Sequence, residues 1–132
     1  MATTIAQLTL TSTDLLSDEL ALSTVASISA AHTSGLSRSA VTSEALGTGS
    51  GQVTVDTADD FASPNFIYVK NTADYHASNN VVYGYFNGQS AHSLQLHGGQ
   101  FAYIPSSGDY TLKFYTSTSG TVIEHMVIGT NA

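Results

Sequence analysis

The chain has 132 residues, a net charge of −7 and no cysteine, and only 10% of its residues are charged. This length allows one domain but leaves no room for two independent cores. Three basic residues are too few for the cationic surface that nucleic acids or anionic membranes require, and the absence of cysteine excludes disulfides and thiol catalysis.

The polar character of the chain comes from hydroxyl groups rather than charges, since it contains 18 serines and 17 threonines. Threonine is a β-branched residue that packs well on a pleated sheet. Hydroxyl and apolar groups are also less costly than charges to bury against a neighbouring molecule. The composition therefore predicts β-structure on a protein that packs against other molecules.

The first part of the chain predicts two strands, at residues 5–10 and 20–28, the second through regular alternation of its side chains. A helix over residues 14–31 is the alternative. The glycine-rich segment 47–51 predicts a loop or hinge. The N-terminus lacks the basic and apolar regions of a signal peptide, so we expect synthesis in a cytoplasm.

From residue 52 onward the strand pattern becomes dense, with turn signals about every ten residues. The predicted strands are 52–56, 66–71, 80–86, 93–96, 100–105, 110–116 and 121–129. Pro64 is expected to precede the second of them, and Asn87-Gly88 after the third is a strong hairpin signal. These features predict an all-β fold, an antiparallel β-sandwich of jelly-roll or immunoglobulin-like type. Its body spans residues 51–132, and residues 1–50 supply an extended N-terminal arm and the first strands of the same domain.

Aromatic side chains occupy the predicted strands and predict core and cross-strand packing. They are Phe66, Tyr68, Tyr83, Tyr85, Phe86, Phe101, Tyr103, Tyr110, Phe114 and Tyr115. An alternative role is a platform for a sugar, because Tyr83 and Tyr85 lie two residues apart and so share one face of their strand.

Histidines are the candidate catalytic or metal-binding groups, at His32, His76, His92, His97 and His125. No pair has the spacing of a helical zinc motif. His92 and His97 flank one predicted strand, and a metal there would take Glu124 or Asp109 as a third ligand. Glu124 and His125 are adjacent on a strand and therefore point to opposite faces, which excludes a catalytic dyad of these two.

Two further motifs have only weak functional readings. Gly49-Ser50-Gly51 is not set between a strand and a helix, as a nucleophile elbow would be. Asp56, Asp59 and Asp60 form an acidic turn that could hold calcium, but the full calcium-loop pattern is missing. We therefore predict no catalytic, cofactor-binding or metal-binding residues, and a protein that is not an enzyme.

Three segments resemble a family of small virion structural proteins of tailed phages, notably marine and cyanobacterial ones. FIYVKNT (66–72) resembles the opening strand of their β-sandwich, and residues 94–128, from LQLHGGQFAYIP to EHMVI, resemble its closing half. TLTSTDLLSDELALS (9–23) resembles their N-terminal openings. The family's usual Pro-Gly-Glu turn is replaced here by His97-Gly98-Gly99-Gln100.

The resemblance implies a capsid decoration, or cement, protein on the capsid surface of a virion. Its partners would be the major capsid protein and copies of itself, with a trimer favoured, and it would contact neither nucleic acid nor membrane. A tail, fibre or adhesin module that binds a host glycan is the alternative. A carbohydrate-binding or calcium-stapled β-module unrelated to phages is a third possibility.

Overall fold

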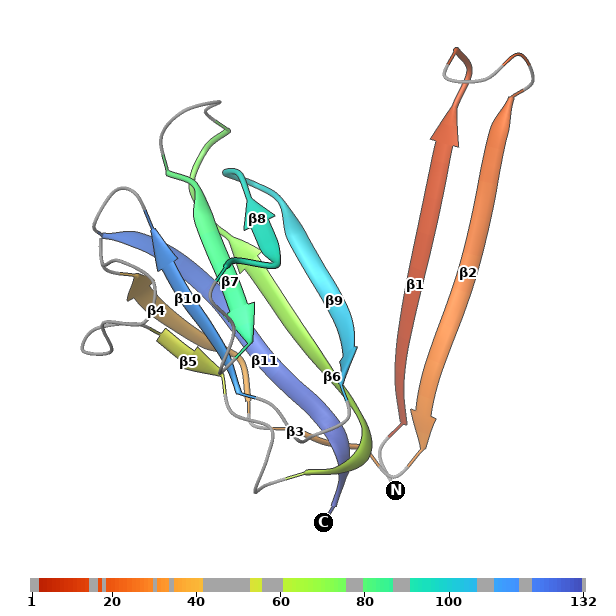
Figure 1. The fold of residues 1–132 in the computed structure, drawn as a ribbon. Coiled ribbons are helices and arrows are strands. Elements are labelled where there is room, and N and C mark those ends of the chain that lie inside the picture. Colours follow the sequence, from red (N-terminus) through yellow and green to blue (C-terminus); the bar gives the residue numbers. More distant parts are fainter. Residues whose placement is uncertain are drawn as a thin grey trace. The chain divides into compact units, whose positions relative to one another are not determined.

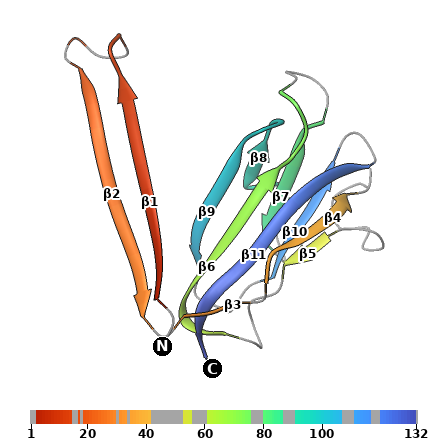
Figure 2. The ribbon, with the colours of Figure 1, turned by 180° about the vertical axis from the view of Figure 1, so that it is seen from behind.

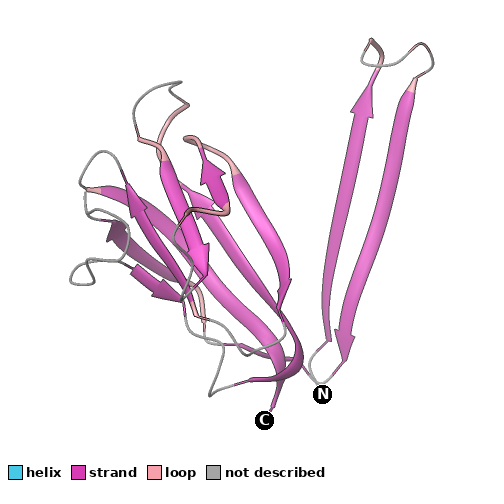
Figure 3. Cartoon of the chain, in the orientation of Figure 1, coloured by secondary structure: helices cyan, strands magenta, loops and turns pink. Residues whose placement is uncertain are grey.

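A computed structural model describes residues 3–14, 17, 19–29, 31–33, 35–41, 53–55, 61–75, 80–86, 91–106, 111–116 and 120–131. These residues form strands, turns and loops, and the described part contains no helix (Figure 3). The strands are β1 (Thr3–Ser12), β2 (Leu20–Ser29), β3 (Ala31–Thr33), β4 (Ser37–Val41), β5 (Val53–Val55), β6 (Phe61–Asn71), β7 (Val82–Phe86), β8 (Leu94–Leu96), β9 (Phe101–Ser106), β10 (Leu112–Thr116) and β11 (Thr121–Asn131). The prediction of an all-β chain is confirmed.

The first unit, Met1–Ala31, contains a two-stranded antiparallel hairpin of β1 and β2. The two strands pair in continuous register, from Thr3 opposite Ser29 to Ser12 opposite Leu20. The strand interpretation of residues 20–28 is therefore confirmed, and the helical alternative for residues 14–31 is wrong. Alternation of small β-branched, hydroxyl and aliphatic residues explains the choice, because it suits a pleated strand better than a helix.

The second unit, His32–Ala132, is a sandwich of two antiparallel sheets (Figures 1 and 2). One sheet has the order β5-β10-β7-β8, and the other has the order β4-β11-β6-β9, with β3 also beside β11. If the eight strands β4 to β11 are renumbered 1 to 8, the two sheets have the orders 2-7-4-5 and 1-8-3-6. This is the jelly-roll arrangement of eight strands. Immunoglobulin-like sheets are ordered differently, so that alternative is wrong.

The core of the sandwich lies between the two sheets and is built from the alternate residues that point inward. Its buried members from the β4-β11-β6-β9 sheet are Val41, Ile67, Val69, Ile123 and Val127. Those from the β5-β10-β7-β8 sheet are Val82, Leu96, Leu112 and Phe114. Phe114 is fully buried on β10 and reaches the position of Gly84 on β7, where a methyl group would come within 2.9 Å of its ring.

Strand β6 begins five residues earlier than predicted and includes Pro64, which was expected to precede it. The register with β11 shifts at this point, since Asn65 pairs with Gly129 but Ala62 pairs with Thr130. The extra residues on β6 form a bulge that leaves Pro64 out of the ladder. A proline lacks the N–H that a central strand needs, and a bulge is where such a strand tolerates it.

The segment that was predicted as an arm, residues 1–50, contributes to both units. Strand β4 pairs with β11 from Ser37 opposite His125 to Val41 opposite Thr121, so it belongs to the sandwich. The hairpin before it forms a sheet of its own. The extended arm within residues 1–50 stays a prediction. The glycine-rich hinge predicted at 47–51 lies outside the described residues.

Candidate functional site

The outer face of the β4-β11-β6-β9 sheet carries two cross-strand rows of apolar side chains. Tyr103, Tyr68 and Met126 form one row, and Pro105, Phe66 and Ile128 form the next. The rings of Phe66 and Tyr103 stack with their centroids 4.9 Å apart. Burial raises the pKa of the Tyr103 hydroxyl, so its ring is partly desolvated. We call the group Phe66, Tyr68, Phe101, Tyr103 and Met126 the aromatic face.

A charged row borders the aromatic face, formed by the cross-strand neighbours Arg38, Glu124 and Lys70. Lys70 lies opposite Phe101, whose exposed ring marks the edge of the aromatic face next to this row. The Arg38 guanidinium lies 3.0 Å from Oε2 of Glu124, and the Tyr68 hydroxyl donates to Oε1 at 3.1 Å. These two contacts, led by Arg38, hold the pKa of the Glu124 carboxyl below its usual value. The carboxylate therefore stays charged, and its hydrogen bond orients the Tyr68 hydroxyl toward Glu124.

The outer face of the opposite sheet carries a cluster of three tyrosines and a histidine. Tyr83 and Tyr115 are cross-strand neighbours with ring centroids 5.2 Å apart, and Tyr85 meets Tyr115 edge-on at 5.9 Å. The His92 ring lies 4.7 Å from Tyr83, and its Nδ1 lies 3.3 Å from the Tyr115 hydroxyl. Burial, followed by repulsion from Tyr83 and Tyr85, raises the pKa of Tyr115, so this phenol stays neutral.

This cluster bears on the sugar-platform alternative for Tyr83 and Tyr85. A platform needs ring faces that are open to solvent, yet the Tyr85 side chain is only 3% exposed. Tyr83 is stacked against Tyr115 and also contacts His92. The pair does share one strand face, as predicted, but its rings serve cross-strand packing and offer no open platform.

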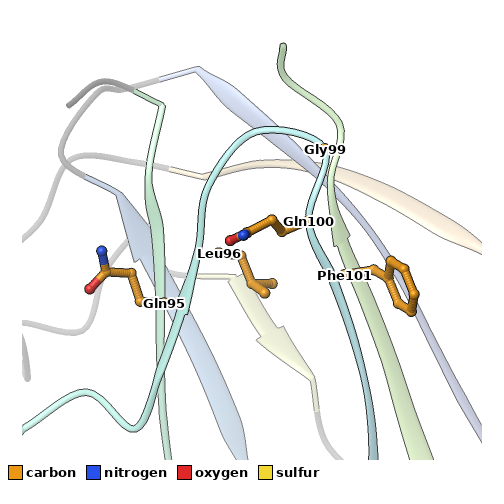
Figure 4. Close-up of a pocket in the computed structure, with 5 residues that line it drawn as sticks. All are labelled: Gln95, Leu96, Gly99, Gln100 and Phe101. Carbon is orange, nitrogen blue, oxygen red and sulfur yellow. The ribbon is translucent and has the colours of Figure 1, made fainter. Parts of the chain in front are cut away.

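A shallow depression lies at the turn between β8 and β9 (Figure 4). It is lined by Gln95, Leu96, Gly99, Gln100 and Phe101. The Gln100 side chain points back across the turn and accepts a hydrogen bond from the His97 backbone N–H at 2.9 Å, whereas Phe101 points away. Gln95 Nε2 lies 3.1 Å from His97 Nε2. The exposed ring of Tyr75 lies 6.0 Å from that of His97, which places two aromatic rings and two amides at this corner.

The predicted metal and catalytic candidates do not gather into one site. His92 and His97 do flank β8, but His92 contacts tyrosines whereas His97 contacts Gln95 and Tyr75. Glu124 binds Arg38 on the outer face. Among the described residues no three histidine or acidic side chains are placed to hold a metal. The remaining candidates lie outside the described residues or have undescribed side chains: His32, His76, Gly49-Ser50-Gly51, Asp56, Asp59, Asp60, Asn87-Gly88 and Asp109.

His125 points inward from β11, and its Nε2 lies 3.1 Å from the Ser39 hydroxyl oxygen. Partial burial lowers the pKa of this imidazole, because charging it there costs hydration. The unfolded chain therefore binds a proton at this position more readily than the native protein does. The sandwich should lose stability as the pH falls from about 6.5 toward the lowered pKa.

We expect His125→Gln to flatten this part of the pH dependence of stability. Urea unfolding of the wild type and the variant, measured at pH 7.5 and pH 5.5, checks the expectation. His92→Gln controls for the loss of a histidine at the surface. A variant as acid-sensitive as the wild type over this interval would contradict the assignment to His125.

Comparison of the chain with protein-family models, with curated proteins and with solved structures finds no match. The described residues include no helix long and apolar enough to cross a membrane.

The residues of the aromatic face were not predicted to form one surface, although the sequence contains a signal for it. Phe66, Tyr68 and Lys70 alternate with buried residues along β6, and Phe101, Tyr103 and Pro105 alternate with partly buried residues along β9. What the sequence could not show is that β6 and β9 are neighbours, which joins the two series into one surface.

Proposed function

We propose that this chain is a non-enzymatic structural protein of a tailed-phage virion, which decorates the capsid and cements contacts between capsomers. Its partners in this proposal are the major capsid protein and copies of itself, and it uses no cofactor. The resemblance of residues 66–72 and 94–128 to such proteins supports it. A jelly-roll sandwich is compatible with the role, since capsid and lectin domains use it, but a fold alone does not imply a function.

The observation that carries the proposal is the aromatic face. Protein interfaces are enriched in Tyr, Phe, Met and Arg at their centres and depleted of acidic residues. The aromatic face has this composition, and two of the three basic residues of the chain, Arg38 and Lys70, lie along its border. Although the protein is acidic overall, this side of it presents the least negative charge to an approaching partner. We assign the aromatic face to the capsid surface.

The first test is electron cryomicroscopy of the purified parent particle, to determine where this chain lies. Density over the joints between capsomers, with the aromatic face toward the capsid, is the expected result. Density confined to the tail or to fibres would contradict the decoration role.

A rebinding experiment tests the aromatic face itself. Capsids stripped of the protein are incubated with wild type or with Phe101→Ser, whose ring is 59% exposed in the free chain. Loss of an aromatic contact in an interface typically costs about 1–2 kcal/mol, so we expect binding about 5- to 30-fold weaker. Tyr75→Ser removes another exposed ring outside the aromatic face and should bind like the wild type. Equal binding of all three proteins would reject the assignment.

The corner between β8 and β9 supports a second candidate function, a tail or adhesin module that binds a neutral glycan. Exposed aromatic rings stack on sugars, and amide side chains bond to their hydroxyls, as Tyr75, Gln95 and Gln100 could do. Here Tyr75→Ser should abolish retention on a glycan array, whereas Phe101→Ser should not. An array on which the wild-type protein finds no ligand would reject this candidate.

A further inference from the structure

Strand β9 ends its sheet, because among the described strands it pairs with β6 alone (Figure 1). The backbone groups of an antiparallel strand point alternately toward one neighbour and toward the other side. The Asn71 N–H donates to the Gln100 carbonyl oxygen at 2.9 Å, so the carbonyl of Gln100 points toward β6. It follows that the N–H and C=O of Phe101 point away from β6, and those of every second residue after it do the same.

Pro105 supports this assignment independently. It belongs to the series that points away from β6, together with Phe101 and Tyr103. A proline has no N–H to donate, and an edge strand accepts it where that N–H would face solvent. The free edge of β9 therefore presents the N–H groups of Phe101 and Tyr103 and the carbonyl groups of all three residues.

The free edge has little of the protection that exposed strands usually carry. Proteins protect such edges with lysines, inward-pointing charges, bulges or prolines. Strand β9 has its proline near one end but no charged residue. Its inward side chains, Ala102 and Ile104, pack against the core yet are only partly buried. A strand added at this edge would cover them, so the edge suits an extended and mainly apolar segment.

The aromatic face and the charged row indicate which molecule supplies this segment. Neighbouring strands lie about 4.8 Å apart, so a partner that covers the rings of Phe101 and Tyr103 also reaches the free edge beside them. The charged row ends here, with Lys70 opposite Phe101. Its two cations and one carboxylate give it a net charge of +1, which suits an acidic residue on the added segment. Strands β1 and β2 of a second copy contain no acidic residue.

We propose that an extended segment of the capsid partner adds to the free edge of β9 as a further strand. Its backbone pairs with Phe101 and Tyr103, and the pairing ends at Pro105, which cannot donate. Alternate side chains of the segment lie beside the aromatic face, and an acidic one faces Lys70. This inference rests on the proposed decoration role and adds the mode of contact, which is backbone pairing.

Two substitutions at Tyr103 separate the backbone from the side chain. Tyr103→Pro and Tyr103→Ala both remove the ring, but only proline also removes the outward N–H. Since this N–H is free in the unbound protein, the two variants should have similar urea midpoints. Rebinding to stripped capsids should be about 5- to 10-fold weaker for Tyr103→Pro than for Tyr103→Ala, because one backbone hydrogen bond to the partner is lost.

Hydrogen exchange of the wild-type protein provides a second measurement that needs no substitution. Mass spectrometry with fragmentation of the bound peptides follows the single amides of β9. The amides of Phe101 and Tyr103 should exchange quickly in the free protein and slowly on capsids. Those of Ala102 and Ile104 point toward β6 and should exchange slowly in both states.

Equal rebinding by the two Tyr103 variants, or edge amides that stay unprotected on capsids, would overturn the backbone pairing and leave decoration intact. Protection that rises with concentration in the free protein would also overturn it, because another copy would then occupy the edge. If Tyr103→Pro failed to fold while Tyr103→Ala folded, the N–H would be used within the chain and the edge would not be free. A wild type that does not bind stripped capsids would reject decoration and this inference together.

Discussion

Replacing Asn71 by leucine is expected to lower the free energy of unfolding by about 3 kcal/mol or more, although the two side chains are similar in size. Asn71 ends β6 inside the sandwich and is fully buried. Its Nδ2 donates to the carbonyl oxygens of Asn80 at 2.6 Å and Leu96 at 3.0 Å, and its Oδ1 accepts from the Ala73 N–H at 3.1 Å. Leucine would leave these backbone groups unpaired in the interior.

Asn71 joins the two sheets and also forms hydrogen bonds with backbone groups of the loop that follows β6. Its own backbone N–H donates to Gln100, and its carbonyl accepts from Gly99, which attaches the end of β6 to the turn between β8 and β9. The side chain then reaches Leu96 on β8, in the opposite sheet. Urea unfolding followed by circular dichroism measures the loss, with all proteins at one concentration because self-association would add to stability.

Asn65 provides the matched control on the same strand. It is also fully buried, but neither atom of its side-chain amide has a hydrogen-bond partner among the described residues. Asn65→Leu should therefore be neutral or stabilising, because an apolar side chain of similar shape replaces a desolvated amide. Equal destabilisation by the two substitutions would show that bulk at β6, rather than hydrogen bonding by Asn71, determines the effect.

Gly98→Ala is the second substitution with a large expected effect, again about 3 kcal/mol or more, because it forces atoms together in a packed turn. Gly98 is buried between β8 and β9. A methyl group there would collide with the backbone carbonyl of Asp74 and would come within 2.7 Å of the carbonyl oxygen of Ala73. Both obstacles are backbone atoms, so no side-chain rotation can relieve the collision, and the turn must move away from Asn71.

Gly99 separates this steric effect from backbone conformation in the same turn. Its φ is +81°, but no described residue outside its chain neighbours lies within 4 Å of the position that a methyl group would take. Gly99→Ala should cost only about 1–2 kcal/mol, the price of a left-handed conformation. Urea unfolding of both variants checks the order. If Gly99→Ala proved the more damaging, the close approach to Asp74 would not be the main constraint.

The aromatic face combines stacked rings with the Arg38–Glu124 pair, which suits a chemically distinct partner.

The sequence by itself determined the class of fold and the strands of the sandwich from β5 onward, whereas β3 and β4 were not predicted. Strict alternation places Ile67 and Val69 inside and Phe66 and Tyr68 outside, because side chains of a strand point to opposite faces in turn. These properties are local, so a single sequence is sufficient to predict them.

Only the tertiary structure decided which strands are neighbours, because pairing in a jelly roll joins segments far apart in the chain. It joined β6 to both β9 and β11 and so assembled the aromatic face from three separate segments. It also chose the jelly roll over an immunoglobulin-like sandwich, placed Pro64 in a bulge and buried Tyr85 on the outer side of its sheet. Each of these depends on packing between distant residues, which local pattern and propensity do not encode.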